Sequence, residues 1–220
     1  MKRKELESLL KELLPNLPGF AVKGALLFQQ PIGPILKGVY LDTSINSRKF
    51  YAQLFVQPLF VPVEYLTFSF GWRLDNRSWD ADAPDTPENL YHRIRKDGLP
   101  FLSRVSKPLD FIDLLNDSSW TAEFPARAKT VFSGSNSHYY QTLLYASIRE
   151  GKYAAALIEF DRLKSVLNMK TQWQQDMLEE STMLLKLFEK NPVQAQLQLD
   201  KWVCATIRNL DLENYRAPIT

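Results

Sequence analysis

The first residues of the chain place their leucines on one side of a helix. Spacings of three and four residues between apolar positions are typical of an amphipathic helix that packs on a core. We therefore predict a helix from Arg3 to Leu14, which Pro15 ends because proline does not continue a helix. Its apolar stripe consists of Leu6, Leu9, Leu10, Leu13 and Leu14.

From about residue 20 to residue 74 the apolar positions follow a period of two, which indicates β-strands. Clean alternation of apolar and polar residues is typical of an antiparallel sheet with one face covered. The segment from Gln57 to Val63 contains two prolines, so we expect a connection or a sheet edge there. The predicted strands are Phe20–Phe28, Leu36–Asp42, Lys49–Val56 and Tyr65–Leu74.

The last two predicted strands each have two distinct faces. Leu66, Phe68, Phe70, Trp72 and Leu74 share one face, and we expect the first helix to cover it. The opposite face carries tyrosines and an arginine, residue types that are enriched at protein interfaces. Either the C-terminal helices cover this face or it binds a partner. The candidate binding residues are Tyr51, Gln53, Phe55, Tyr65, Thr67 and Arg73.

A polar, acidic segment follows, and helices begin after it. Thr86 is the expected N-cap of a helix, with Pro87 at its first position and a stop at Gly98. A further short helix is expected from Leu109 to Leu115. The serine-rich and irregular stretch 118–136 is the best candidate for a linker.

Helical periodicity dominates the last third of the chain. Gly151 and the Asn191-Pro192 pair mark the ends of helices, because glycine favours the C-terminal cap and proline the first helical turn. Four helices in two hairpins are predicted. Their approximate ranges are Ser137–Glu150, Tyr153–Leu167, Thr171–Glu189 and Asn191–Leu210.

These elements together predict an α+β protein. An N-terminal helix would lie on an antiparallel sheet of about four strands, and an α-helical C-terminal third would follow. We expect an α+β domain over 1–117, a linker over 118–136, and a helical hairpin domain over 137–220 that packs on the first.

The run YASIREGKYAAALIEFDRL resembles the turn of a tetratricopeptide hairpin, in which a glycine ends one helix and an alanine lies in the next. A second copy of this turn follows at an offset of 40 residues. There, Ala155 is matched by Ala195 and Leu157 by Leu197. The resemblance covers about one repeat, and because a solenoid generally needs about three, we expect these hairpins to pack on the α+β part of the chain.

Residues 1–117 resemble uncharacterised bacterial domain families. The shared features are the leading helix, the start around Gly19 and Gly24, the strand end Trp72-Arg73-Leu74, and the run GLPFL from Gly98. Some members of such families are thought to act in toxin-immunity or defence settings. The resemblance implies that context and brings no catalytic residues with it.

Composition narrows the possible partners. The chain has 220 residues, 45% of them hydrophobic, and a formal net charge of +2. A dedicated nucleic-acid binder usually carries a larger basic excess, so the charge argues against nucleic acid as a partner.

Cys204 is the single cysteine, which excludes an internal disulfide. No run of about 18 apolar residues suggests a membrane span, and we expect a cytoplasmic protein.

Few side chains suggest a catalytic, metal-binding or cofactor-binding site. The acidic cluster Asp75, Asp80, Asp82 and Asp85 could offer oxygens to a hard cation, but aspartates at such positions more often serve turns and helix caps. His92 and His138 lack the spacing of a zinc site. No phosphate-binding glycine loop is present. We therefore expect no metal, no cofactor and no catalytic residue, and Cys204 in its apolar run is expected to be a small buried residue.

Three functions remain in competition. The first is a non-catalytic adaptor or immunity-type protein of the bacterial cytosol, which holds another protein on its sheet face or its helical hairpins. The second is a metal-assisted enzyme built on His92 and the acidic segment from Asp75 to Asp85. The third is a nucleic-acid-associated defence factor, whose binding would depend steeply on salt.

Overall fold

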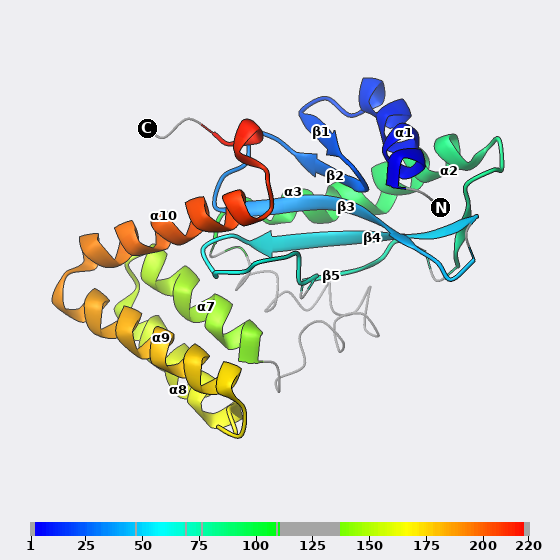
Figure 1. Cartoon of the computed structure of the whole chain (residues 1–220). Coiled ribbons are helices and arrows are strands. Elements are labelled where there is room, and N and C mark those ends of the chain that lie inside the picture. The colour runs from blue at the N-terminus through cyan, green and yellow to red at the C-terminus, as the bar shows by residue number, and fades with distance from the viewer. Residues whose placement is uncertain are drawn as a thin grey trace. The chain divides into compact units, whose positions relative to one another are not determined.

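The structure is a computed structural model, which describes residues 3–46, 48–68, 70–75, 77–108, 110 and 137–217 (Figure 1). These residues form two compact units, between which the chain passes after residues 57, 69, 106 and 213. The sheet unit contains Met1–Gln57, Phe70–Ser106 and Asn214–Thr220, and the helical unit contains Pro58–Ser69 and Lys107–Glu213.

The predicted first helix is confirmed as α1 (Arg3–Leu13), and a 3-10 turn, η1 (Leu14–Asn16), follows it. The leucines of its apolar stripe that lie within α1 are all buried. α1 contacts β1, β2 and α2. The helix therefore covers the first hairpin of the sheet, as an amphipathic helix needs an apolar surface to pack on.

The predicted α+β class is confirmed, and the described residues contain six strands where about four were predicted. Their order in the sheet is β1-β2-β3-β4-β5, and β6 also pairs with β4. The pairs β1–β2, β2–β3, β4–β5 and β4–β6 are antiparallel. The segment predicted as one strand from residue 20 is a hairpin that turns at Gly24 (φ +59°). The strands are β1 (Phe20–Lys23), β2 (Leu26–Gln29), β3 (Ile35–Thr43), β4 (Lys49–Pro58), β5 (Phe70–Arg73) and β6 (Trp79–Asp80).

The strand predicted from residue 65 to residue 74 is longer than the strand in the structure. β5 begins only at Phe70. Phe68 has a φ of +52°, a left-handed conformation that a strand cannot contain and that a bulky residue rarely adopts. Phe70, Trp72 and Leu74 are buried as expected, whereas Leu66 and Phe68 lie outside the sheet and are half-buried.

Helices after the acidic segment cover the apolar face of β4 and β5. They are α2 (Thr86–Arg93), a π-helical turn η2 (Ile94–Gly98) and α3 (Leu99–Arg104). The Phe101 ring lies 4.0 Å from that of Trp72. Gly98 does not stop the helix as predicted. A Cβ there would lie 3.3 Å from Leu54 Cδ1, so glycine lets the helical segment approach the sheet closely.

The four predicted C-terminal helices are confirmed within a few residues. Gly151, with a φ of +72°, ends the first of them, and its N–H donates to the Ile148 carbonyl at 3.0 Å. The Asn191 side chain caps the last one by accepting the Gln194 N–H at 3.2 Å. The helices are α7 (Ser137–Arg149), α8 (Tyr153–Val166), α9 (Gln172–Lys190) and α10 (Pro192–Asn209), and a 3-10 turn, η3 (Glu213–Tyr215), follows.

α7 is the most buried helix of the helical unit. Residues 141–148 are all buried, including the polar side chains of Gln141 and Ser147. α7 contacts α8, α9 and α10, and each helix of the four also contacts the next. In the predicted repeat, the buried alanines are Ala156 in α8 and Ala195 in α10, whereas Leu157 and Leu197 are exposed.

Two sequence predictions fall outside the described residues. The helix predicted from Leu109 to Leu115, apart from residue 110, lies in the undescribed part of the chain, as does the linker 118–136. Both therefore stay predictions. Among the helices that are described, none is long and apolar enough to span a bilayer.

Candidate functional site

Three of the six predicted binding residues come together on the outer face of the sheet. Gln53 in β4 pairs with Arg73 in β5. The Arg73 guanidinium carbon lies 3.8 Å from the centre of the Tyr51 ring, which is the geometry of a cation–π contact. Arg73 is exposed, and Tyr51 and Gln53 are half-buried. This trio is a small amphipathic surface whose arginine is held in place by the tyrosine.

The other three predicted residues do not belong to that surface. Phe55 lies on the same face of β4 but is 0% exposed. Tyr65 is 70% exposed but lies outside any strand. Thr67 also lies outside the strands and is half-buried. The prediction assumed a strand through residues 65–69, and that strand does not form.

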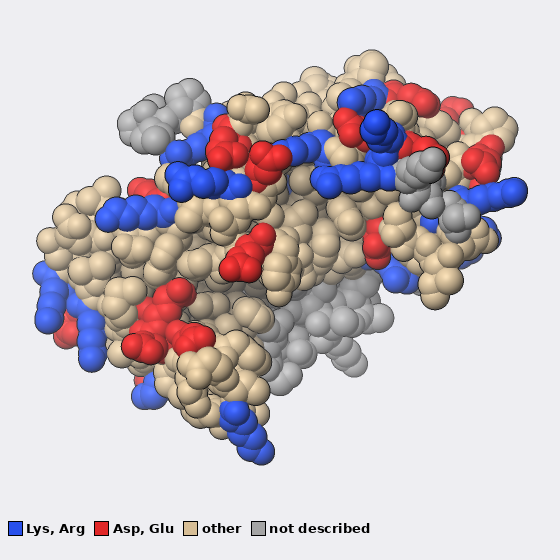
Figure 2. Space-filling view, in the orientation of Figure 1, with Lys and Arg blue, Asp and Glu red and all other residues tan. Residues whose placement is uncertain are grey.

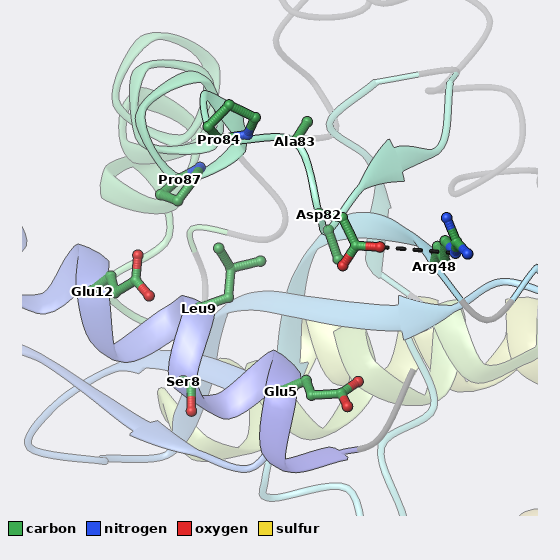
Figure 3. Close-up of a pocket in the computed structure, with 10 residues that line it drawn as sticks. Glu5, Ser8, Leu9, Glu12, Arg48, Asp82, Ala83, Pro84 and Pro87 are labelled. Carbon is green, nitrogen blue, oxygen red and sulfur yellow. Dashed lines mark ion pairs between the residues drawn. The ribbon is translucent and has the colours of Figure 1, made fainter.

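The acidic segment borders a polar hollow of about 850 Å³ in the sheet unit (Figure 3). Glu5, Ser8, Leu9 and Glu12 of α1 line one side, and Arg48 with residues 81–84 and 87 lines the other. The Asp82 carboxylate forms an ion pair with Arg48 at 3.9 Å. Both side chains are more than 70% exposed, and such a surface pair stabilises a fold very little.

The aspartates of this segment form local hydrogen bonds. Asp75 Oδ1 accepts the N–H of Arg77 at 3.3 Å, and Asp80 Oδ1 accepts that of Asp82 at 3.1 Å. Both are turn-forming bonds. Asp85 Oδ2 accepts the side-chain amide of Asn89 at 2.8 Å. Within the described ranges, no group of three or more histidine, cysteine or acidic side chains is placed to hold a metal ion.

The histidines lie in different units. The His92 side chain is 62% exposed, and its Nε2 lies 3.6 Å from Glu88 Oε1, one helical turn away. His138 stacks on Trp173 with ring centres 5.9 Å apart, and burial lowers the pKa of its imidazole while a hydrogen bond with Gln141 opposes that shift. Cys204, expected to be buried, is half-buried on α10. These positions give the predicted His92-based enzyme site no further support.

The helical unit carries most of the exposed apolar side chains in the described residues. Across the described residues of both units, ten large hydrophobic residues are exposed, and eight of them lie between residues 153 and 197 of the helical unit. The remaining two are Ile45 and Tyr65. The eight are Tyr153, Leu157 and Ile158 of α8, Met169 of the α8–α9 loop, Trp173 and Met183 of α9, and Val193 and Leu197 of α10.

A buried polar network supports α9 and α10 from inside the helical unit. The Tyr145 hydroxyl of α7 donates to Glu180 Oε1 of α9 at 2.7 Å, and the Gln141 amide donates to the Tyr145 oxygen at 3.3 Å. Trp202 of α10 stacks on the Tyr145 ring at 5.4 Å. Burial raises the pKa of the Glu180 carboxyl, and the bond from Tyr145 opposes that rise.

The sequence did not predict the exposed apolar residues as a group. Leucine, methionine and tryptophan at helical spacing are interpreted first as core. Their exposure depends on which helix faces the others cover, and that is a property of tertiary packing. The sequence contained one indication of this exposure, which is the number of apolar positions in α8. A single apolar stripe cannot include all of Tyr153, Leu157, Ile158 and Phe160.

Comparison with known proteins finds no match for the chain. No family model matches it, and neither a curated protein nor a solved structure does.

Proposed function

We propose that the protein is a non-catalytic binder of another protein, and that the exposed apolar edge of α8 or that of α10 carries the binding surface. The observation that carries this proposal is the concentration of exposed apolar side chains in the helical unit. Scattered single apolar residues are normal on protein surfaces, whereas a gathering of them marks an interaction site.

The spacing on two helices supports the same function. Leu157 follows Tyr153 by one turn on α8, and Leu197 follows Val193 by one turn on α10. Residues four apart lie on the same side of a helix and present one continuous apolar edge. Tyrosine also combines a large apolar ring with a polar tip, which suits a surface that is wet when unbound.

The Tyr51–Gln53–Arg73 trio is a second candidate surface for the same function. The cation–π contact restricts the Arg73 side chain before any partner arrives, so binding would cost less side-chain entropy. The trio is smaller than predicted, since Phe55 is buried. Only the resemblance of residues 1–117 supports the bacterial toxin-immunity context. That resemblance does not identify a partner.

The test is affinity capture of the tagged protein from cells that naturally produce it, with nuclease treatment and quantitative mass spectrometry. Two double variants remove the apolar edges: Leu157→Ser with Ile158→Ser, and Val193→Ser with Leu197→Ser. Ile45→Ser is the matched control, because it removes an exposed apolar side chain of the sheet unit. Arg73→Ala tests the second surface.

We expect a stoichiometric protein partner that binds wild type and Ile45→Ser equally and is lost from at least one helical variant. All variants should retain the wild-type melting temperature, since the changed side chains are exposed. If a partner binds both helical variants as it binds wild type and is lost with Arg73→Ala, the binding surface lies on the sheet instead. Absence of any nuclease-resistant partner would contradict the proposal.

A further inference from the structure

The outward side of α9 forms a ridge between two hollows. One hollow of about 410 Å³ lies toward α10 and includes Gln198 and Trp202. The other, of about 680 Å³, includes Met169 and Leu187. Glu179 and Met183 line both hollows, so they form the crest between them. A ridge flanked by grooves is the shape that packs against another helix.

Charges along this ridge are separated by sign. Acidic side chains gather on the surface over α9 (Figure 2). Asp176, Glu179 and Glu180 precede Met183, whereas Lys186 and Lys190 follow it. Glu189 also follows Met183, but its side chain interacts with Tyr153 of α8 and does not line either hollow. Like charges four residues apart, as in the Lys186–Lys190 pair, destabilise an isolated helix.

The fold of the single chain does not use this separation. Lys190 lies in the last helical turn, where the helix dipole favours a cation, but the first turn of α9 contains no acidic residue. Glu179, Lys186 and Lys190 form no ion pair within the part of the chain that the structure describes. The charged ends of the ridge are therefore available to a partner.

The charge pattern of α9 is complementary to that of a second copy of α9 that runs in the opposite direction. Asp176 lies seven residues before Met183 and Lys190 lies seven after it. Glu179 lies four before it and Lys186 three after. When two copies of α9 pack antiparallel with their Met183 residues opposite each other, Asp176 of one copy therefore meets Lys190 of the other, and Glu179 lies near Lys186. Met183 is 46% exposed, so it is available for an apolar contact at the centre.

We propose that α9 is a homodimer interface, in which a second copy of this chain packs antiparallel across a two-fold axis at Met183. A two-fold interface must be self-complementary, because the same surface serves both copies. The charge pattern and the ridge between two hollows meet that requirement. Methionine suits the centre of such a contact, since its flexible side chain adapts to a second methionine.

The underside of the ridge is anchored to α7, the buried helix of the unit. Glu180 accepts the hydroxyl of the buried Tyr145 at 2.7 Å. Trp202, which lines the smaller hollow, stacks on the same ring. Tyr145 therefore orders one side chain on each of α9 and α10 before a second copy binds, and these two side chains add little to the entropy cost of binding.

The first measurement is the mass of the full chain in solution, by sedimentation velocity over a range of protein concentrations. We expect a concentration-dependent species of twice the 25.5 kDa chain mass. Met183→Glu places two carboxylates on the two-fold axis and should weaken association at least about tenfold. A strictly monomeric wild type at several hundred micromolar would overturn the proposal.

A charge exchange makes the test specific to the antiparallel arrangement. The double variants Asp176→Lys with Glu179→Lys, and Lys186→Glu with Lys190→Glu, should each be monomeric, because like charges then face each other. Mixed together, they should form a heterodimer, since each then offers the charges that the other lacks. Lys201→Glu with Arg208→Glu, two exposed positions on α10, is the matched control and should dimerise as wild type does.

Failure of the mixture to associate would contradict the arrangement even if wild type dimerises. The outcome is also separate from the proposed binding of another protein, because that surface lies on α8 or α10. Monomeric α9 variants that still capture a partner would support both proposals, and a dimeric protein that captures none would support the homodimer alone.

Discussion

The hydroxyl of Tyr145 links α7 to α9 through a single oxygen atom. It donates to Glu180 of α9, lies 3.3 Å from the Ser181 oxygen and accepts the amide of Gln141. Buried polar groups cost free energy unless hydrogen bonds satisfy them. This network therefore stabilises the helical unit only while all its members are present.

Tyr145→Phe is expected to lower the free energy of unfolding by about 1–2 kcal/mol, because the half-buried Glu180 carboxylate loses its 2.7 Å hydrogen bond and keeps the longer one, at 3.4 Å, from the Gln141 amide. Urea unfolding at dilute concentration measures the change. Tyr140→Phe is the matched control on the same helix, and its half-buried hydroxyl should contribute much less. Equal effects of the two variants would contradict the role given to the network.

The same carboxyl makes stability depend on pH. Burial raises the pKa of Glu180, so the folded chain holds its proton more tightly than the unfolded chain does. Its contribution to stability is then present below the unfolded pKa and is lost as pH rises through the folded pKa. Glutamine cannot ionise, so the stability of Glu180→Gln relative to wild type should be greater at pH 7 than at pH 4.

Urea midpoints of Glu180→Gln and wild type at both pH values measure this difference. Glu150→Gln, the same change at an exposed position just after α7, is measured alongside as the matched surface variant. If the difference between Glu180→Gln and wild type is the same at pH 4 and pH 7, ionisation of Glu180 does not oppose folding.

Residues of this network could not be predicted from the sequence. Tyr145 and Gln141 are one helical turn apart, but their partner Glu180 lies 35 positions further along the chain. A pattern of polar and apolar positions shows which face of a helix is polar. It does not show that a second helix supplies a hydrogen-bond partner for that face.

Gly38 shows how closely two strands of the sheet approach each other. It pairs with Phe28 across β2 and β3. A Cβ at Gly38 would meet the Leu27 carbonyl oxygen and lie 2.8 Å from the Phe28 Cα. Both neighbours are backbone atoms, so the strands would have to separate to admit a side chain.

Gly38→Ala is expected to destabilise the protein by about 2 kcal/mol, the usual cost of forcing extra atoms into a packed region. Gly33→Ala is the matched control, since a Cβ there meets nothing within 4 Å. Thermal and urea unfolding of the two variants provide the comparison. A Gly38→Ala variant as stable as Gly33→Ala would show that β2 and β3 can separate freely.

Elements with strong local signals were predicted well. α1 and α7 to α10 combine a 3.6-residue period with helix-ending residues such as Gly151 and Pro192, and those signals act over a few residues. β5 was overextended because alternation continues to Tyr65, whereas Phe68 turns the backbone away. Gly98 was predicted to end the helix, because the sequence does not show that this residue packs closely on Leu54.

The C-terminal segment returns to the sheet unit after the four helices. Tyr215 accepts the Ile32 N–H at 2.8 Å, and the Ala217 N–H donates to the Ile32 carbonyl at 2.9 Å. The Tyr215 ring lies 5.0 Å from that of Phe28. Residues at opposite ends of the sequence therefore complete one unit.

A chain truncated after Glu213 should lose part of the stability of the sheet unit. Hydrogen exchange with mass spectrometry is the suitable measurement, because it reports each segment separately. We expect faster exchange in β1, β2 and the 30–34 turn, and little change in α7 to α9. A chain truncated after Ala217 should match the full chain, and equal exchange in both truncated chains would contradict this role of Tyr215.

At the scale of the whole chain, the sequence predicted the α+β class and the helical C-terminal third. It did not predict that residues 58–69 group with the helices and residues 214–217 with the sheet. Both assignments depend on contacts between residues far apart in the sequence. The candidate sheet surface was predicted only in part for the same reason, because the burial of Phe55 depends on what covers it.

The return of the C-terminal segment also has a consequence for synthesis on the ribosome. Domains generally fold as units while the chain emerges, with the N-terminal one first. Here, β1 and β2 are made early, yet the backbone bonds from Ile32 to residues 215 and 217 form only after the last helix has been made. The sheet unit is therefore completed only after α10 has been made, and a nascent chain that stalls before Tyr215 leaves the backbone groups of Ile32 without these partners.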